Sequence, residues 1–139
     1  MDCIFCRIAK GEIPSYKVFE NNNLIAILDI SQATKGHTLI IPKTHAKNLY
    51  ELDDLSAAEI FKVVPFIAKG IKKAFNPIGL NVVINTEKPL QSVNHFHIHL
   101  VPRYDNDGFD IVFVNHQADM NQDIYNQIKQ AIKDNLEQK

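Results

Sequence analysis

Short blocks of apolar residues, separated by polar turns, run along the first third of the chain and predict its elements. A helix is expected at 3–10, because Gly11 suits a helix C-cap and Pro14 prevents the helix from continuing. Three runs of β-branched or apolar residues bounded by turn residues predict strands at 17–20, 24–30 and 37–42. The three asparagines between the first two strands tolerate positive φ and predict a hairpin turn.

The middle of the chain carries the pattern of a long helix. Ser56 and Glu59 match a capping box, in which Ser56 is the N-cap and Glu59 reaches back to it. Apolar residues then recur at helical spacing and form one core face: Ile60, Val63, Val64, Ile67, Ile71 and Phe75. Pro65 lies inside this pattern and predicts a kink, and Asn76-Pro77 ends the helix.

The last part of the chain predicts further strands and a closing helix. Apolar runs predict strands at 80–85, 94–102 and 111–114. An apolar stripe with a spacing of four residues predicts a C-terminal helix over about 123–138. Hairpin-length connections favour an antiparallel sheet of about five strands with helices packed on one face, an α+β fold in a single domain over 1–139. Parallel βαβ winding is disfavoured, because only one helix lies in a strand crossover.

Composition narrows the class of partner and the cellular compartment. The chain has 139 residues, 45% of them hydrophobic, and a net charge of -1. A near-neutral chain gains little from counterion release, so a nucleic acid polymer is not an expected partner, whereas a single nucleotide is compatible. The sequence has no apolar run of 18 residues and does not start like a secretory signal, so we expect no membrane span and a cytoplasmic protein.

Three histidines stand at alternate positions within one predicted strand: His95, His97 and His99. Side chains alternate across a strand, so the three imidazoles share one face. The apolar residues between and after them then point to the core: Phe96, Ile98 and Leu100. One interpretation is a solvated face with incidental histidines. The strict period favours function, either metal binding or a nucleophilic imidazole with neighbours that orient it and neutralise a phosphate.

The segment 95–101 reads His-φ-His-φ-His-φ-φ, with φ apolar, and so resembles the signature of the histidine triad (HIT) superfamily. Further blocks match in order: Cys3-Ile4-Phe5-Cys6, Gly11-Glu12-Ile13-Pro14, Leu28-Asp29-Ile30, Lys35-Gly36-His37, Ile40-Ile41-Pro42-Lys43-Thr44-His45 and Pro102-Arg103-Tyr104. The resemblance covers 3–109 and is strongest to the Hint branch and its bacterial Hit-like members. It implies a HIT-like fold.

The resemblance implies a nucleotide hydrolase or nucleotidyl transferase that attacks an α-phosphate. Its substrates would be purine nucleoside phosphoramidates or related nucleotide conjugates, cleaved through a covalent nucleotidyl-histidine. His97 matches the nucleophile, a role that suits an imidazole, which is neutral and nucleophilic near pH 7. His99 would bond the phosphate, and His37 matches a further active-site histidine. Asp29 matches the carboxylate that receives the ribose hydroxyls.

The resemblance also assigns seven nucleotide-binding positions. Three would lie by the phosphate: Asn85, Gln91 and Ser92. Four would form the apolar base pocket: Ile4, Phe5, Ile8 and Ile27. Without the resemblance, these apolar residues could simply be core, and Asp29 or Asn85 could cap a turn.

The loop at 85–91 departs from the family pattern Asn-x-Gly-x-x-Ala-Gly-Gln. Pro89 and Leu90 stand where the family has small residues, and glycine is what allows backbone to approach a phosphate closely. This departure bears on substrate range and rate more than on the reaction type. It keeps open one alternative, a nucleotide-binding regulatory module with little turnover. A second alternative is a dinucleoside polyphosphate hydrolase of the related branch.

Cys3 and Cys6 form a C-x-x-C, which is half of a tetrahedral zinc site or, alternatively, a redox pair. A stable disulfide is not expected in a reducing cytosol. The resemblance adds His45 and His95 as the remaining ligands of a closed, structural Cys2His2 zinc site, located at the end of the histidine strand. No catalytic metal is expected, and His116 receives no role.

Two features of the pattern concern assembly. Phe61 and Phe66 lie off the core face of the long helix, and the strand at 80–85 is apolar on both faces. Exposed sheet edges are usually protected, and the resemblance implies a homodimer in which this helix and strand meet their twofold mates. The alternative is a monomer that buries both phenylalanines under the C-terminal helix.

Overall fold

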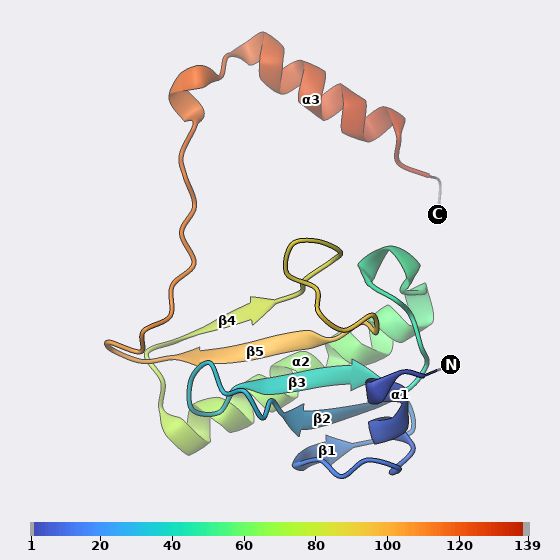
Figure 1. Cartoon of the computed structure of the whole chain (residues 1–139). Helices are drawn as coiled ribbons and strands as arrows, with labels where there is room; N and C mark the ends of the chain where they lie inside the picture. The colour runs from blue at the N-terminus through green and yellow to red at the C-terminus, as the bar shows by residue number, and fades with distance from the viewer. Residues whose placement is uncertain (1, 138–139) are drawn as a thin grey trace. The chain divides into compact units, whose positions relative to one another are not determined.

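The computed structural model describes residues 2–137. The described part of the chain up to Phe109 forms an antiparallel sheet with helices on both of its faces (Figure 1). The strands, in chain order, are β1 (Lys17–Glu20), β2 (Leu24–Leu28), β3 (Thr38–Pro42), β4 (Gly79–Val83) and β5 (Ile98–Arg103). Every neighbouring pair is antiparallel, and the spatial order is β1-β2-β3-β5-β4. The predicted α+β class with a five-stranded antiparallel sheet is confirmed.

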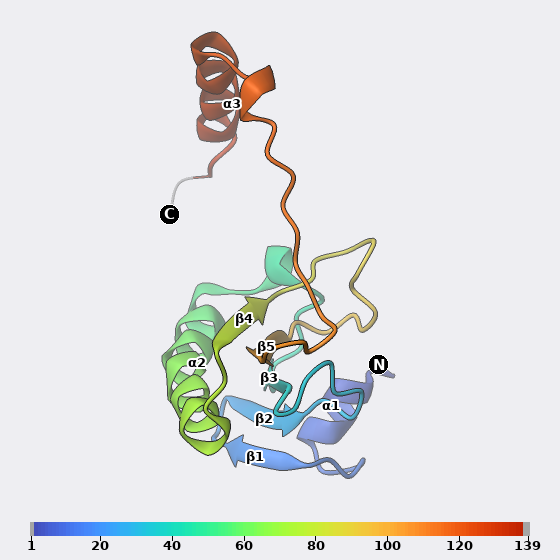
Figure 2. The ribbon, with the colours of Figure 1, turned by 90° about the vertical axis from the view of Figure 1, so that its left-hand side faces the viewer.

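The described helices are α1 (Ile4–Ala9), α2 (Asp54–Phe75) and α3 (Gln122–Asp134), with short 3-10 turns η1 (Leu49–Glu51) and η2 (Gln117–Asp119). Helix α2 covers one face of the sheet and α1 covers the other (Figure 2). Alternate residues of β2 divide between these layers, since Ala26 packs with the α2 side and Ile27 with the α1 side. The prediction that helices pack on one face was therefore wrong, because α1, though short, buries Phe5 and Ile8 against the opposite face.

Helix α2 begins earlier than the sequence pattern predicted. Asp53, not Ser56, is its N-cap, and the Asp53 carboxylate accepts a hydrogen bond from the Ser56 N–H at 2.7 Å. Glu59 bonds Asn23 and Lys62 instead of reaching back to the cap. An Asp carboxylate caps the free N–H groups at a helix N-terminus as well as a Ser hydroxyl does. Both Asp53 and Ser56 were therefore suitable N-caps, and the helix begins after the earlier one, Asp53. The helix is continuous across Pro65 and ends at Phe75, and its C-cap Asn76 has a φ of 47°.

Strand β5 begins at Ile98, not at residue 94 as predicted. Before Ile98 the chain bonds to groups outside the sheet: the Phe96 N–H donates to the Ala46 carbonyl at 2.7 Å. The Pro42 carbonyl on β3 bonds the His95 ring at 2.7 Å. His95 and His97 therefore lie on the segment that enters the strand, whereas Phe96 and Ile98 pack in the core under α2 as expected.

The chain divides into a compact unit that ends at Phe109 and a second unit that starts at Asp110. The strand predicted at 111–114 is not formed, and its apolar side chains remain exposed because no strand pairs with them. The last predicted helix is α3, which ends at Asp134, and residue 138 of that prediction lies outside the described residues. Among residues 2–137, no helix has the length and apolar character needed to span a bilayer.

Candidate active site and metal centre

A row of paired residues across three strands forms the floor of a pocket on the α1 face of the sheet. Ile27 on β2 pairs with Leu39 on β3, and Leu39 pairs with His99 on β5. Residues paired across neighbouring strands point to the same face, so these three side chains stand side by side. The pocket floor thus consists of two apolar side chains followed by one polar side chain, His99.

Helix α1 forms a wall of this pocket through Ile4, Phe5 and Ile8. The helix has six residues, and Cys3 caps it by accepting a hydrogen bond from the Cys6 N–H at 3.4 Å. Such a short helix has little stability of its own in water, so its position depends on the burial of Phe5 and Ile8 and on what holds Cys3 and Cys6. The pocket has a volume of about 590 Å³, within the usual range for a small-molecule site.

Most of the pocket lining is apolar, and the polar side chains that line it include Asp29, Ser92, His97 and His99. One carboxylate oxygen of Asp29 accepts a hydrogen bond from the Ser31 N–H at 2.8 Å. The other lies 3.5 Å from Nε2 of His37. An apolar cavity with a few convergent polar groups can hold a flat apolar ring and orient the polar part of the same ligand.

His97 has the geometry of a nucleophile held in one tautomer. Its Nδ1 lies 2.7 Å from the His95 carbonyl oxygen, which can only accept, so Nδ1 carries the proton and Nε2 has the free lone pair. Burial lowers the pKa of His97, although the bond to His95 and the charge of Asp29 oppose the shift. The ring is therefore neutral near pH 7, and the edge of Phe5 packs against it at 5.0 Å between centroids.

His99 and His37 form a second imidazole pair, with His37 Nε2 and His99 Nδ1 2.9 Å apart. Burial is the main cause that lowers the pKa of His99 to about 4, and the neighbouring His97 and His37 add to it. Burial also lowers the pKa of His37, against the attraction of Asp29. Both rings are thus neutral at pH 7. His37 lies behind His99 and is not among the residues that line the pocket.

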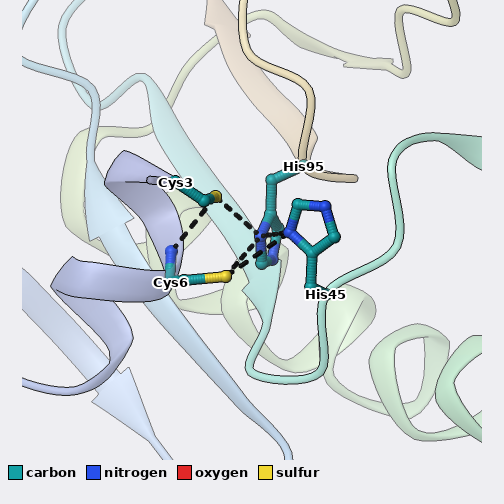
Figure 3. A group of neighbouring side chains, drawn as sticks. All are labelled: Cys3, Cys6, His45 and His95. Carbon is teal, nitrogen blue, oxygen red and sulfur yellow. Dashed lines mark hydrogen bonds between the residues drawn. The ribbon is translucent and has the colours of Figure 1, made fainter. Parts of the chain in front are cut away.

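Cys3, Cys6, His45 and His95 converge at the point where the chain enters β5 (Figure 3). Cys3 Sγ lies 3.3 Å from His95 Nδ1, and Cys6 Sγ lies 3.4 Å from His45 Nδ1. The two Nδ1 atoms are 3.1 Å apart. Four ligands around a tetrahedral zinc stand roughly 3.3–3.8 Å from one another, so the group is close to the size that such an ion needs.

The protonation of the group also suits a metal. The Pro42 carbonyl accepts from His95 Nε2 at 2.7 Å, which leaves Nδ1 with its lone pair toward the cysteines. Burial raises the pKa of the Cys6 thiol, and hydrogen bonding to Cys3 adds to the shift, so a bound cation would replace a proton there. The four residues could therefore hold a metal ion, and His97 lies outside the group.

Two of the residues assigned to the phosphate do not line the pocket. Gln91 instead organises its own loop, since its amide donates to the Lys47 and Val93 carbonyls and accepts from the Glu87 N–H. Asn85 follows the end of β4 and is half-buried. His116, which had no assigned role, is exposed and lies in the second unit, 3.7 Å from Asp119.

Several pocket residues were missed by the sequence reasoning, among them Ile13, Tyr16, Ile30, Leu39 and Val93. Strand alternation contained the signal for Leu39, because it lies two residues from His37 and so shares its face. Ile13 lies in a block that matched the HIT pattern but received no role. Tyr16 carried no signal, because an exposed aromatic residue next to a strand is ordinary in any sequence.

Comparison with known proteins agrees with this fold. Residues 10–106 match the model of the HIT domain. The chain is 49% identical over 137 residues to the protein hit of Bacillus subtilis, covering 97% of this chain and 94% of that protein. It is 43% identical over 104 residues to the adenosine 5'-monophosphoramidase hnt1 of Schizosaccharomyces pombe, covering 74% and 75% of the two proteins.

Solved structures match as well. A crystal structure of a HIT family member from Bacillus subtilis has a TM-score of 0.96 and 47% identity, with 100% of both chains covered. A Zn-bound histidine triad family protein from Mycobacterium smegmatis has a TM-score of 0.74 and 32% identity, covering 94% of this chain and 98% of that one. The chain belongs to the HIT domain family.

The neutral imidazoles predict how stability depends on pH. An unfolded histidine takes up a proton near pH 6.5, whereas the pKa of folded His99 is about 4 and that of His37 is also lowered. Between these values the unfolded chain binds more protons, so the free energy of unfolding should fall as pH falls from 7 to 4.5. Urea unfolding at several pH values measures this slope. The double variant His37→Gln, His99→Gln should have a smaller slope and His116→Gln the same slope; equal slopes in all three would contradict the assignment.

Proposed function

We propose that this protein is a nucleotide hydrolase that cleaves purine nucleoside phosphoramidates or related conjugates at the α-phosphate. The observation that carries the proposal is the His97 ring, whose Nδ1 is held by the His95 carbonyl while the ring itself lines an apolar pocket. An imidazole fixed in this tautomer is a neutral nucleophile at pH 7. The hydrolase activity named for the fission yeast relative supports the reaction class.

The pocket provides a place for each part of such a substrate. The base would lie between α1 and the floor residues Ile27 and Leu39, and the ribose hydroxyls would bond the Asp29 carboxylate. Nε2 of His97 would attack the α-phosphorus, form a phosphorus–nitrogen bond and release the leaving group. Water would then cleave this bond and restore His97. His99 and Ser92 stand beside the reacting phosphate, where donors stabilise its developing charge.

Substitution of the nucleophile tests the reaction. His97→Ala should reduce the turnover of an adenosine phosphoramidate by at least about 10³-fold, because removing a nucleophile leaves only binding and charge stabilisation. AMP binding, measured by calorimetry, should persist, since the base and ribose contacts remain. His116→Ala, on the exposed second unit, should retain full turnover. Wild-type turnover by His97→Ala would refute the mechanism, and AMP binding without turnover by the unmodified protein would favour a regulatory nucleotide-binding module.

We further propose that Cys3, Cys6, His45 and His95 bind one structural zinc ion. Two thiolates and two imidazoles within 4.8 Å match a closed tetrahedral zinc site, which leaves no position for water or substrate. The Zn-bound Mycobacterium smegmatis relative supports the identity of the metal. The residues present would hold the ion by four ligands, and its role would be to fix α1 against the entry to β5.

Metal analysis tests this centre. Protein purified without chelators should contain about one zinc per chain, as a closed four-ligand site requires. Cys3→Ser should lose the zinc and clearly lower the thermal midpoint, because Cys3 holds α1. Its kcat should change little, because Cys3 does not touch the reacting groups. Ser56→Ala, elsewhere in the same unit, should retain the zinc. Purified wild-type protein without zinc would refute the site.

A homodimer completes the proposal. Phe61 and Phe66 on α2 are 45% and 60% exposed, and Val82 on the edge strand β4 is 48% exposed. Apolar side chains exposed on a helix and on a sheet edge are typical of an interface. Pairing of α2 and β4 with their twofold mates would cover these side chains in an isologous contact.

Sedimentation equilibrium at micromolar concentration tests the dimer. The expected mass is twice 15.8 kDa for the wild-type protein. Phe61→Glu should yield the monomer mass, because it places a charge at the centre of the proposed contact. Tyr50→Glu, at an exposed aromatic residue on η1, should remain dimeric. A wild-type mass near 15.8 kDa would refute the dimer.

A further inference from the structure

Outside the Cys2His2 group, a second cluster gathers three groups that could bind a cation. Ligand atoms of Asp29, His37 and His99 lie within 4.8 Å of one another. Two histidines and one carboxylate are a familiar set of metal ligands. A metal would need the lone pairs of both imidazoles directed at one point. The hydrogen bonds around His37 show that they are not.

The backbone decides where the protons of these two rings lie. The Ala33 N–H donates to His37 Nδ1 at 3.1 Å, so Nδ1 must carry the lone pair. A neutral ring has one proton, which is therefore on Nε2 of His37 and points into the cluster. At 2.9 Å from it, His99 Nδ1 must accept. The single proton of His99 is then on Nε2, the ring nitrogen remaining for the pocket.

Gln32 holds the loop that places this backbone amide. Its side-chain NH₂ donates to the Asp29 carbonyl and, at 2.7 Å, to the His37 carbonyl. Its side-chain oxygen accepts from the Gly36 N–H at 2.9 Å. One side chain thus joins both ends of the loop between Asp29 and His37. Gln32 does not line the pocket, so these bonds, rather than substrate contact, account for its position.

The same loop is fastened to the strand that carries His99. Thr34 is 7% exposed, and its hydroxyl donates to the Pro102 carbonyl on β5 at 2.5 Å. The Tyr104 hydroxyl donates to the Lys35 carbonyl at 2.7 Å. Gly36 has a φ of +94°, and a Cβ there would lie 3.0 Å from the Phe75 ring. The loop therefore has one close-packed position relative to β5.

We propose that the loop between Asp29 and His37 fixes the proton of His99 on Nε2, with Gln32 and His37 as positioning residues. The inference rests on the proposed function for its consequence: His99 then donates a hydrogen bond to the anionic phosphate. In the other tautomer a lone pair would face the phosphate oxygens and repel them. Donors aligned before the reaction are a major source of catalytic rate.

Nuclear magnetic resonance of the zinc-loaded, ¹⁵N-labelled protein at pH 7 tests the tautomer without any turnover. Protonated and unprotonated imidazole nitrogens have well-separated ¹⁵N shifts, and two-bond couplings to the ring protons assign them. We expect a protonated Nε2 and an unprotonated Nδ1 in both His37 and His99. A proton on Nδ1 of His99 would overturn the inference even if the protein hydrolyses nucleotides, and the expected pattern would support it even if it does not.

Paired substitutions test the positioning residues. Gln32→Glu keeps the acceptor for Gly36 and loses both donors, so a second tautomer of His37 or His99 should appear and kcat should fall at least about threefold, a fraction of what a lost donor costs. Gln127→Glu, the same change on exposed α3, should alter neither. An unchanged tautomer and kcat in Gln32→Glu would remove Gln32 from the inference.

If Gln32→Glu does not fold, two variants of His37 test the same proposal. His37→Gln retains a side-chain donor for His99 Nδ1 and should keep the Nε2-protonated form, whereas His37→Leu removes the donor and should have about tenfold lower kcat than His37→Gln. Equal kcat in the two variants would contradict the proposal. A second equivalent of zinc that shifts the Nε2 signal of His37 and the Nδ1 signal of His99 would also overturn it, because the cluster would then be a metal site.

Discussion

The site depends on the fixed position of one fully buried residue, His95. Its ring Nδ1 faces Cys3, Cys6 and His45, its Nε2 bonds the Pro42 carbonyl at the end of β3, and its own carbonyl accepts from His97. One residue thus joins α1, the sheet and the nucleophile. A buried polar ring without partners would be costly, so the contacts of Nδ1 and Nε2 satisfy the ring, while the carbonyl positions His97.

Local pattern was sufficient for the class of fold, whereas most of the candidate site residues were assigned by the family resemblance. The run of β-branched or apolar residues at 38–41 and the alternation around Ile98 predicted the central strands, because successive residues of a strand show which of its faces is buried. The start of β5 could not be predicted in the same way. It is set by bonds from Phe96 to Ala46 and from His95 to Pro42, which join residues about 50 positions apart.

The role of Gln91 shows the same limit within the phosphate loop. A glutamine before the histidines suggested a phosphate ligand, but its amide is occupied by Lys47, Val93 and Glu87. The loop here lacks the glycines of the family pattern, and Glu87 adopts a φ of 61°. Hydrogen bonds of the Gln91 side chain can hold this positive φ at Glu87, a backbone conformation that glycine usually supplies. The sequence pattern identifies the loop, but only the folded contacts show that Gln91 holds the loop and does not line the pocket.

The row of Ile27, Leu39 and His99 couples the chemistry of the site to the pairing of its strands. A slip of one residue between β3 and β5 would turn His99 into the core beneath α2 and bring Ile98 or Leu100 into the pocket. Such a chain would bury an imidazole among aliphatic side chains and expose an aliphatic residue to the ligand. The alternation of histidines with large apolar residues therefore also selects the strand register during folding, because only one register places polar side chains in the pocket and apolar side chains in the core.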